Sequence, residues 1–155
     1  MNDIDPRARL AELGLYLPPV TPPLASYVPA VRSGDHVYVS GQLPIVDGKL
    51  LATGKVGADV SAEEAKDLAQ RCALNAIAAI ESLVGINQVV RVVKVVGFVA
   101  SAEGFNGQPG VINGASELFG AVFGDAGKHA RSAVGVSQLP LDAPVEVEVI
   151  AEVQG

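Results

Sequence analysis

Arg131 is the residue of this chain whose type and surroundings best suit ligand chemistry. It opens the segment RSAVGVSQL, which alternates as a β-strand does. One face of that strand carries Arg131, Ala133, Gly135 and Ser137, and the other carries valines. The residues beside the arginine are too small to fill space, so they leave room next to a guanidinium. A guanidinium can hold a carboxylate through two parallel hydrogen bonds.

Glu148 is the second charged residue in an unusual place, because it stands among valines in VEVEVIAEV. The alternation puts the valines on one face and Glu146, Glu148 and Glu152 on the other. An interstrand ion pair between Arg131 and one of these glutamates would explain both strands without any ligand. The pattern alone therefore leaves an ion pair and a functional site as equal alternatives.

Other kinds of site have little support in the sequence. His36 and His129 lie far apart, and no cluster of residues has metal-ligand spacing, so we expect no metal. Cys72 belongs to the apolar face of a helical pattern and is predicted to be a small core residue. Phosphate-binding glycine motifs and the G-x-S-x-G motif are absent, so we expect no cofactor and no serine nucleophile of that type.

Composition favours one compact domain. The chain has 155 residues, of which 49% are hydrophobic and 18% are charged. Its formal net charge of -6 disfavours nucleic acid as a partner. A single cysteine, no secretory leader and no apolar run of membrane-spanning length favour a cytoplasmic location without membrane association.

The elements that must position these residues follow from periodicity and capping signals. Residues 1–23 are predicted as an N-terminal extension, a short helix capped by Asp5 and then a proline-rich strap. Residues 24–155 are predicted as a single α+β domain of order β-β-α-β-α-β-β. The expected strands are 26–31, 36–43, 88–101, 131–139 and 145–153, and the expected helices are 61–84 and 111–123. Both helices should cover one face of the sheet, leaving the other for a symmetric oligomer.

Four segments, in order, resemble the RidA family (YjgF, reactive intermediate deaminase, endoribonuclease L-PSP-like). They are SYVPAV near Tyr27, VSGQLP near Ser40, INGASELF near Asn113 and ARSAVGVSQLPLDAPVEVEVIA at the C-terminal end. The resemblance covers about residues 24–153. It implies a chorismate-mutase-like fold and a homotrimer with clefts between subunits. It also implies hydrolytic deamination of reactive enamines and imines, such as 2-aminoacrylate, to 2-keto acids and ammonia without a cofactor.

The resemblance also assigns roles to five residues. Arg131 matches the carboxylate-binding arginine, and Glu148 matches the acidic residue near the water. Tyr27, Ser40 and Asn113 match positions that line the same cleft and bind substrate. Each of these three has a structural alternative: packing at a subunit contact for Tyr27, a hydroxyl satisfied by backbone for Ser40, and a brace or cap of the helix for Asn113.

Several features set the chain apart from shorter family members. These are the N-terminal extension, part of the EGFNGQPG loop, Gly135 where many members have an acidic residue, and Ala133 where cysteine is common. His129 is predicted to be a surface-loop histidine. These differences leave the physiological substrate open. The alternative function is a non-catalytic protein that binds a small carboxylate metabolite. Endoribonuclease activity, the older family label, is disfavoured by the net charge.

Overall fold

The protein is described by a computed structural model that covers residues 4–20 and 26–155. Its helices are α1 (Pro6–Glu12), α2 (Ala62–Leu83) and α3 (Gln108–Phe123). Its strands are β1 (Ala30–Ser33), β2 (His36–Gln42), β3 (Ile45–Val46), β4 (Lys49–Leu50), β5 (Val89–Ala100), β6 (Ala130–Val136) and β7 (Val145–Val153). Short 3-10 helices occupy Ile86–Gln88, Gly124–Gly127 and Pro140–Asp142.

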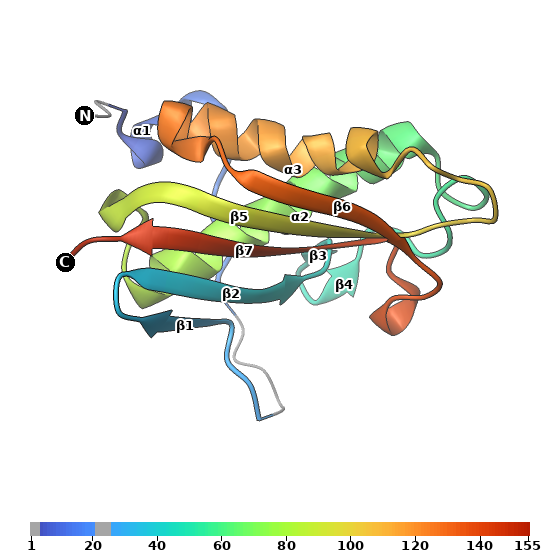
Figure 1. Cartoon of the computed structure of the whole chain (residues 1–155), viewed down its shortest axis with the longest axis horizontal. Coiled ribbons are helices and arrows are strands. Elements are labelled where there is room, and N and C mark those ends of the chain that lie inside the picture. The colour runs from blue at the N-terminus through green and yellow to red at the C-terminus, as the bar shows by residue number, and fades with distance from the viewer. Residues whose placement is uncertain (1–3, 21–25) are drawn as a thin grey trace.

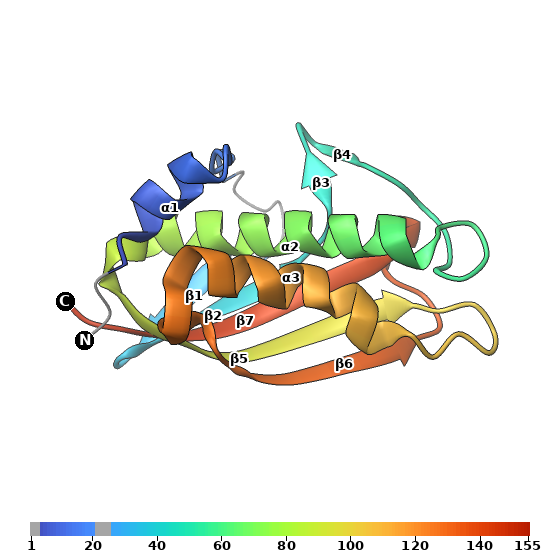
Figure 2. The same ribbon diagram turned by 90° about the horizontal axis from the view of Figure 1, so that it is seen from above.

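The main sheet has five strands in the order β1-β2-β7-β5-β6. All neighbours are antiparallel except β5 and β6, which are parallel and are connected through α3. Helices α2 and α3 lie side by side over one face of the sheet (Figures 1 and 2). The predicted α+β layout with both helices on one face is therefore confirmed.

Helix α2 forms where the sequence predicts it. Ser61 accepts a hydrogen bond from the Glu64 amide (3.1 Å), as a helix cap does, and Gly85 follows the helix with φ of 87°. The face of α2 toward the sheet is made of small and branched apolar residues, and Ile77 and Ile80 are fully buried there. Cys72 is also fully buried, as predicted, and burial raises the pKa of its thiol well above its usual value.

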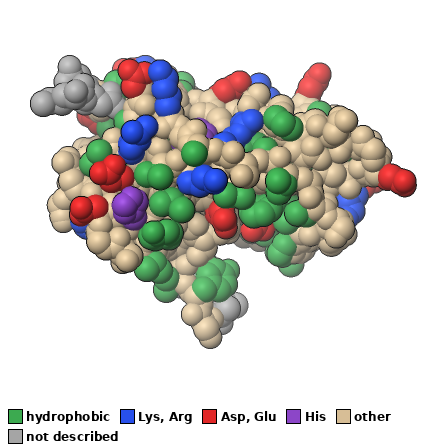
Figure 3. Space-filling view, in the orientation of Figure 1, with side chains coloured by type: hydrophobic (Ala, Val, Ile, Leu, Met, Phe, Trp, Pro, Cys, Tyr) green, Lys and Arg blue, Asp and Glu red, His purple; other side chains and the backbone are tan. Residues whose placement is uncertain are grey.

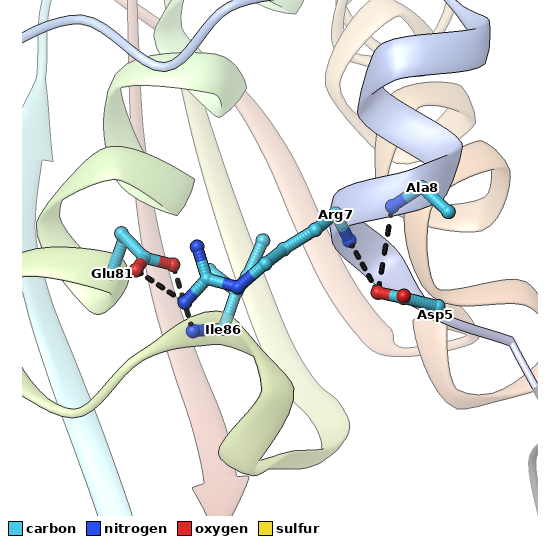
Figure 4. A network of polar contacts seen from close by, with 5 residues as sticks. All are labelled: Asp5, Arg7, Ala8, Glu81 and Ile86. Atoms are coloured by element: carbon cyan, nitrogen blue, oxygen red, sulfur yellow. Dashed lines mark hydrogen bonds and ion pairs between the residues drawn. The ribbon is translucent and has the colours of Figure 1, made fainter.

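Helix α1 docks on the rest of the chain through polar contacts (Figure 4). Asp5 caps the helix by accepting hydrogen bonds from the amides of Arg7 and Ala8. The Arg7 guanidinium pairs with Glu81 of α2, whose other carboxylate oxygen accepts from the Ile86 amide (3.0 Å). The predicted short helix and its cap are thus present, and the helix is tied to the end of α2.

Two details near the start of the sheet differ from the prediction. The first strand begins at Ala30, so Tyr27 precedes it instead of lying within it. Pro29 has no amide hydrogen to donate to a neighbouring strand, so the regular pairing with β2 starts only at Ala30. The second difference is a two-stranded hairpin, β3–β4, in the connection that follows β2.

The outer face of the sheet, the face away from α2 and α3, remains exposed in the single chain. Val96 and Phe98 on the outer face of β5 are only partly buried. Val31, Tyr38 and Val134 on neighbouring strands are 50%, 47% and 43% exposed. Figure 3 shows hydrophobic side chains gathered on this face, with charged side chains among them. Such a surface is typical of one that packs against another protein.

Candidate functional site

Arg131 lies on β6 and points toward α3. Its Nη1 donates to Asn113 Oδ1 (2.8 Å) and to Ser116 Oγ (3.2 Å). Asn113 and Ser116 are three residues apart on α3, so they share the helix face that lies against β6. Two of the five predicted site residues, Arg131 and Asn113, are thus in direct contact, because α3 connects the parallel strands β5 and β6.

The remaining donors of Arg131 are uncommitted. Its Nη1 is occupied by the two bonds to α3, whereas Nε and Nη2 make no hydrogen bond with the described residues. The guanidinium is partly buried and forms no ion pair within the described chain. The Nε–Nη2 edge is one of the edges through which arginine binds a carboxylate with two parallel hydrogen bonds. The group is therefore held in place while one binding edge stays available.

Ser116 and His129 extend this cluster, and neither was a predicted site residue. His129 Nε2 lies 2.8 Å from Ser116 Oγ, and its Nδ1 lies 2.6 Å from the Gly127 carbonyl oxygen. The side chain is partly buried instead of projecting from a surface loop. The spacing Asn113-x-x-Ser116 on a predicted helix was the only sequence signal for Ser116, because His129 is thirteen residues away.

Glu148 lies on the opposite side of the sheet from Arg131. Val95 of β5 is the Cα partner of Arg131 on β6 and of Val149 on β7, whereas Glu148 pairs with the next residue, Val96. Successive residues of a strand point to opposite faces, so Glu148 projects from the outer face. β5 also separates β6 from β7. The interstrand ion pair considered above therefore does not form within one chain.

Tyr27 and Ser40 lie near the other edge of the sheet, beside β1 and β2. Tyr27 is 58% exposed, and Ser40 Oγ donates to the Val28 carbonyl (2.6 Å), so its hydroxyl is satisfied by backbone. Tyr27, Gly41 and Gln42 line a cavity of about 530 Å³ between the strap, β2 and α2. Arg71 also lines it, and its buried Nε has no hydrogen-bond partner among the described residues.

Glu146 gives the outer face a second carboxylate close to Glu148. Burial raises the pKa of Glu146, and the charge of Glu148 raises it further. Its side chain packs against Gly41 so closely that a Cβ at position 41 would overlap the carboxylate. The outer face near the end of β2 is therefore acidic and tightly packed.

The expected space beside Arg131 is only partly open. At Gly135 a Cβ would meet the Gln108 amide nitrogen at 2.8 Å and Ser101 Oγ at 3.0 Å. That amide nitrogen donates to Ser101 Oγ (3.1 Å) and to the Phe105 carbonyl (2.9 Å). The Gln108 side chain thus takes the place that a larger residue at position 135 would need.

Sequence comparison places this chain among known proteins. Residues 7–153 match the family model described as "YjgF/chorismate mutase-like, putative endoribonuclease". The chain belongs to this family. The family fold predicted from the four motifs is thereby confirmed for this YjgF-family chain, whose match also includes part of the N-terminal extension.

Individual relatives of this YjgF-family chain carry different names. It is 44% identical over 147 residues to Protein TCP17 of Trypanosoma cruzi, covering 94% of this chain and 92% of that protein. It is 33% identical over 138 residues to a 2-iminobutanoate/2-iminopropanoate deaminase of Dermatophagoides farinae, covering 88% and 93%. The crystal structure of Atu1372 of Agrobacterium tumefaciens, a protein of unknown function, superposes with a TM-score of 0.90 at 44% identity, covering 96% and 92%.

Within residues 4–20 and 26–155, no group of three or more His, Cys, Asp and Glu side chains is arranged to hold a metal ion. None of the helices in the same ranges combines the length and the apolar character needed to cross a membrane.

Proposed function

We propose that this protein hydrolyses 2-imino acids, of the kind formed from 2-aminoacrylate, to 2-keto acids and ammonia. The observation that carries the proposal is the state of Arg131, a fixed guanidinium without a protein carboxylate partner and with its Nε–Nη2 edge available. The named deaminase among the relatives supports the same substrate class.

In the proposed reaction, Arg131 binds the carboxylate of the imino acid and holds the neighbouring C=N carbon in place. Water adds to that carbon, and its proton passes to the Glu148 carboxylate. When the imine is protonated, this addition leaves an amine and a hydroxyl on the same carbon. Glu148 returns its proton to the amine nitrogen, the C–N bond breaks, and ammonia leaves while the hydroxyl gives up its proton to water and becomes the carbonyl. An imine carbon is already electrophilic, so the residues need only orient the substrate and move protons.

The site requires a second copy of the chain in this proposal. Arg131 and Asn113 lie near the β6 edge of the sheet, on the side covered by α3. Tyr27 and Ser40 lie near the opposite edge, formed by β1 and β2, and Glu148 projects from the outer face. No single chain brings these groups around one ligand. A homotrimer with clefts between subunits would bring the β6 edge of one copy to the Tyr27 edge or outer face of another, and would also bury the exposed apolar residues.

Complementation between two inactive variants tests both parts of the proposal. Arg131→Ala and Glu148→Gln chains are co-expressed with different tags, and mixed oligomers are purified. Turnover is measured by generating 2-iminobutanoate with an amino-acid oxidase and following 2-oxobutanoate formation. If each site takes Arg131 from one subunit and Glu148 from its neighbour, about a third of the sites in purified mixed trimers contain both native residues. Mixed oligomers no more active than the separate variants would contradict the shared site, and wild-type protein no faster than Arg131→Ala would contradict the deaminase.

Binding of a small carboxylate metabolite without turnover is the second candidate. It is favoured by the neutral character of Asn113 and Ser116, because neither side chain can take a proton from water as a carboxylate does. Calorimetry with a panel of 2-keto acids distinguishes the candidates. Saturable binding that depends on Arg131, together with no imine turnover, would support the binding protein.

A further inference from the structure

We infer that Ser116 and His129 are positioning residues for Arg131, which orient its free Nε–Nη2 edge toward a carboxylate. The inference rests on the proposed role of Arg131 as the carboxylate-binding group. It adds two residues to the site, and it identifies the imidazole as a support instead of a base that acts on the substrate.

The hydrogen bonds that link Arg131, Ser116, His129 and Gly127 all have their donors on the Arg131 side. The Gly127 carbonyl can only accept, so His129 Nδ1 at 2.6 Å carries the proton. In the neutral imidazole Nε2 is then an acceptor, and the Ser116 hydroxyl at 2.8 Å donates to it. The hydroxyl oxygen remains free to accept from Arg131 Nη1 at 3.2 Å. Each donor in the chain from Arg131 to Gly127 has a matching acceptor.

The imidazole at the end of this chain is itself fixed. Gly127 is buried against α3, where a Cβ would overlap the Phe119 carbonyl, so its own carbonyl has a defined position. The Phe119 ring meets the His129 ring edge-on, with centroids 5.9 Å apart and planes at 82°. A backbone carbonyl, an aromatic ring and a hydroxyl thus hold His129 from three sides.

The neutrality of the two acceptors explains what the arrangement achieves. An acidic residue beside Nη1 would hold the guanidinium equally well, but its negative charge would oppose a ligand carboxylate. Asn113 and Ser116 fix the plane of the guanidinium and leave its positive charge uncompensated. Without the Ser116 hydroxyl, Nη1 keeps one acceptor and the guanidinium can rotate away from the orientation that favours two parallel bonds.

Carboxylate selectivity is the property that tests this inference. Calorimetry compares the affinity for 2-oxobutanoate with that for 2-oxobutanamide, which lacks the carboxylate, in the intact oligomer. We expect Ser116→Ala to lower the ratio of the two affinities about tenfold, the effect of losing one well-formed charge-assisted hydrogen bond. Ser116→Thr, which keeps the hydroxyl, should retain most of the ratio. Ser82→Ala, an exposed serine of α2 whose hydroxyl donates to the Ala79 carbonyl, is the control and should leave the ratio unchanged.

A double-mutant cycle separates positioning from general structural damage. His129→Phe keeps the ring contact with Phe119 but removes the acceptor, so adding it to Ser116→Ala should lower the ratio no further. In an Arg131→Gln background, Ser116→Ala should have no effect. A wild-type ratio in Ser116→Ala, with the ratio lost in Arg131→Gln, would overturn the inference and leave the proposed function intact. A ratio unchanged in Arg131→Gln itself would overturn both.

Discussion

The face of the sheet covered by α2 and α3 and the exposed outer face surround their charged groups differently. Arg131, on the covered face, is held by neutral groups of its own chain, and its Nε–Nη2 edge makes no hydrogen bond with the described residues. Glu146 and Glu148 on the outer face lie close enough for one to raise the pKa of the other, and neither forms an ion pair within the described chain. The guanidinium of Arg131 is thus held by hydrogen bonds within one chain, whereas the two carboxylates have no cationic partner among the described residues.

The largest expected effect is at Arg131. Arg131→Gln should lower affinity for 2-oxobutanoate about a hundredfold, because it removes both the charge and the paired hydrogen bonds. Arg131→Lys should fall between Gln and wild type, since it restores charge without the planar pair of donors. Calorimetry measures the affinities. Arg9→Gln on α1 serves as the control. Equal losses of affinity for Arg131→Gln and Arg131→Lys would show that the paired geometry is essential. No loss in either variant would show that Arg131 does not bind the carboxylate.

Glu148 should affect turnover more than binding. Glu148→Gln removes the proton acceptor but preserves size, so kcat for 2-iminobutanoate should fall at least about tenfold while 2-oxobutanoate affinity stays within about twofold. Steady-state kinetics and calorimetry on the same preparation give the two values. A parallel loss of both would mean that Glu148 contributes to binding instead of to the chemical step.

The tight packing of the outer face predicts a contrast between two glycines. Gly41→Ala places a Cβ against the Glu146 carboxylate and should destabilise the fold by about 1–3 kcal/mol. Gly120→Ala on the exposed side of α3 meets no atom within 4 Å and should stabilise by about 0.5–1 kcal/mol through helix propensity. Urea denaturation measures both changes. A neutral Gly41→Ala would show that the Glu146 side chain moves aside easily.

The smallest expected effect is the pH dependence contributed by Glu146. Its pKa is raised from the ordinary value of 4.5, so the folded state favours the protonated carboxyl. Stability from this group is therefore complete below pH 4.5 and is lost as the pH rises through the raised pKa. Glu146→Gln should increase the Tm by about one or two degrees at pH 7 and leave it unchanged near pH 4. A larger increase in Tm at pH 4 than at pH 7 would contradict a raised pKa for Glu146.

Local signals in the sequence predicted much of the fold, and long-range pairing accounts for what they missed. The cap at Ser61 and the helical spacing of apolar residues defined α2 well, because both depend on neighbours a few residues apart. Nothing local indicates that β7 lies between β2 and β5, or that β5 and β6 are parallel. For this reason the alternation in the last two strands suggested an ion pair that the strand order prevents.

In the candidate site, too, local features were predicted from the sequence and long-range contacts were not. Arg131 stood out because a charge beside small residues is a local feature. The motif resemblance assigned Asn113 to the same cleft as Arg131, without predicting their hydrogen bond. Ser116 and His129 are thirteen residues apart and meet only after α3 packs against β6. Periodicity identified the apolar face of that helix and gave no information about which polar residues would border it.

The position of β7 has a consequence for the order in which the protein can fold during synthesis. β7 is synthesised after the other four strands of its sheet, yet it joins β1–β2 to β5–β6 in the middle of that sheet. On the ribosome, the β1–β2 hairpin and the β5–α3–β6 unit must therefore wait as separate pieces, and the edges of β2 and β5 that later pair with β7 stay unpaired. Arg131 and its supporting residues belong to the second piece, so their hydrogen-bonded cluster can assemble before the sheet that carries it is complete.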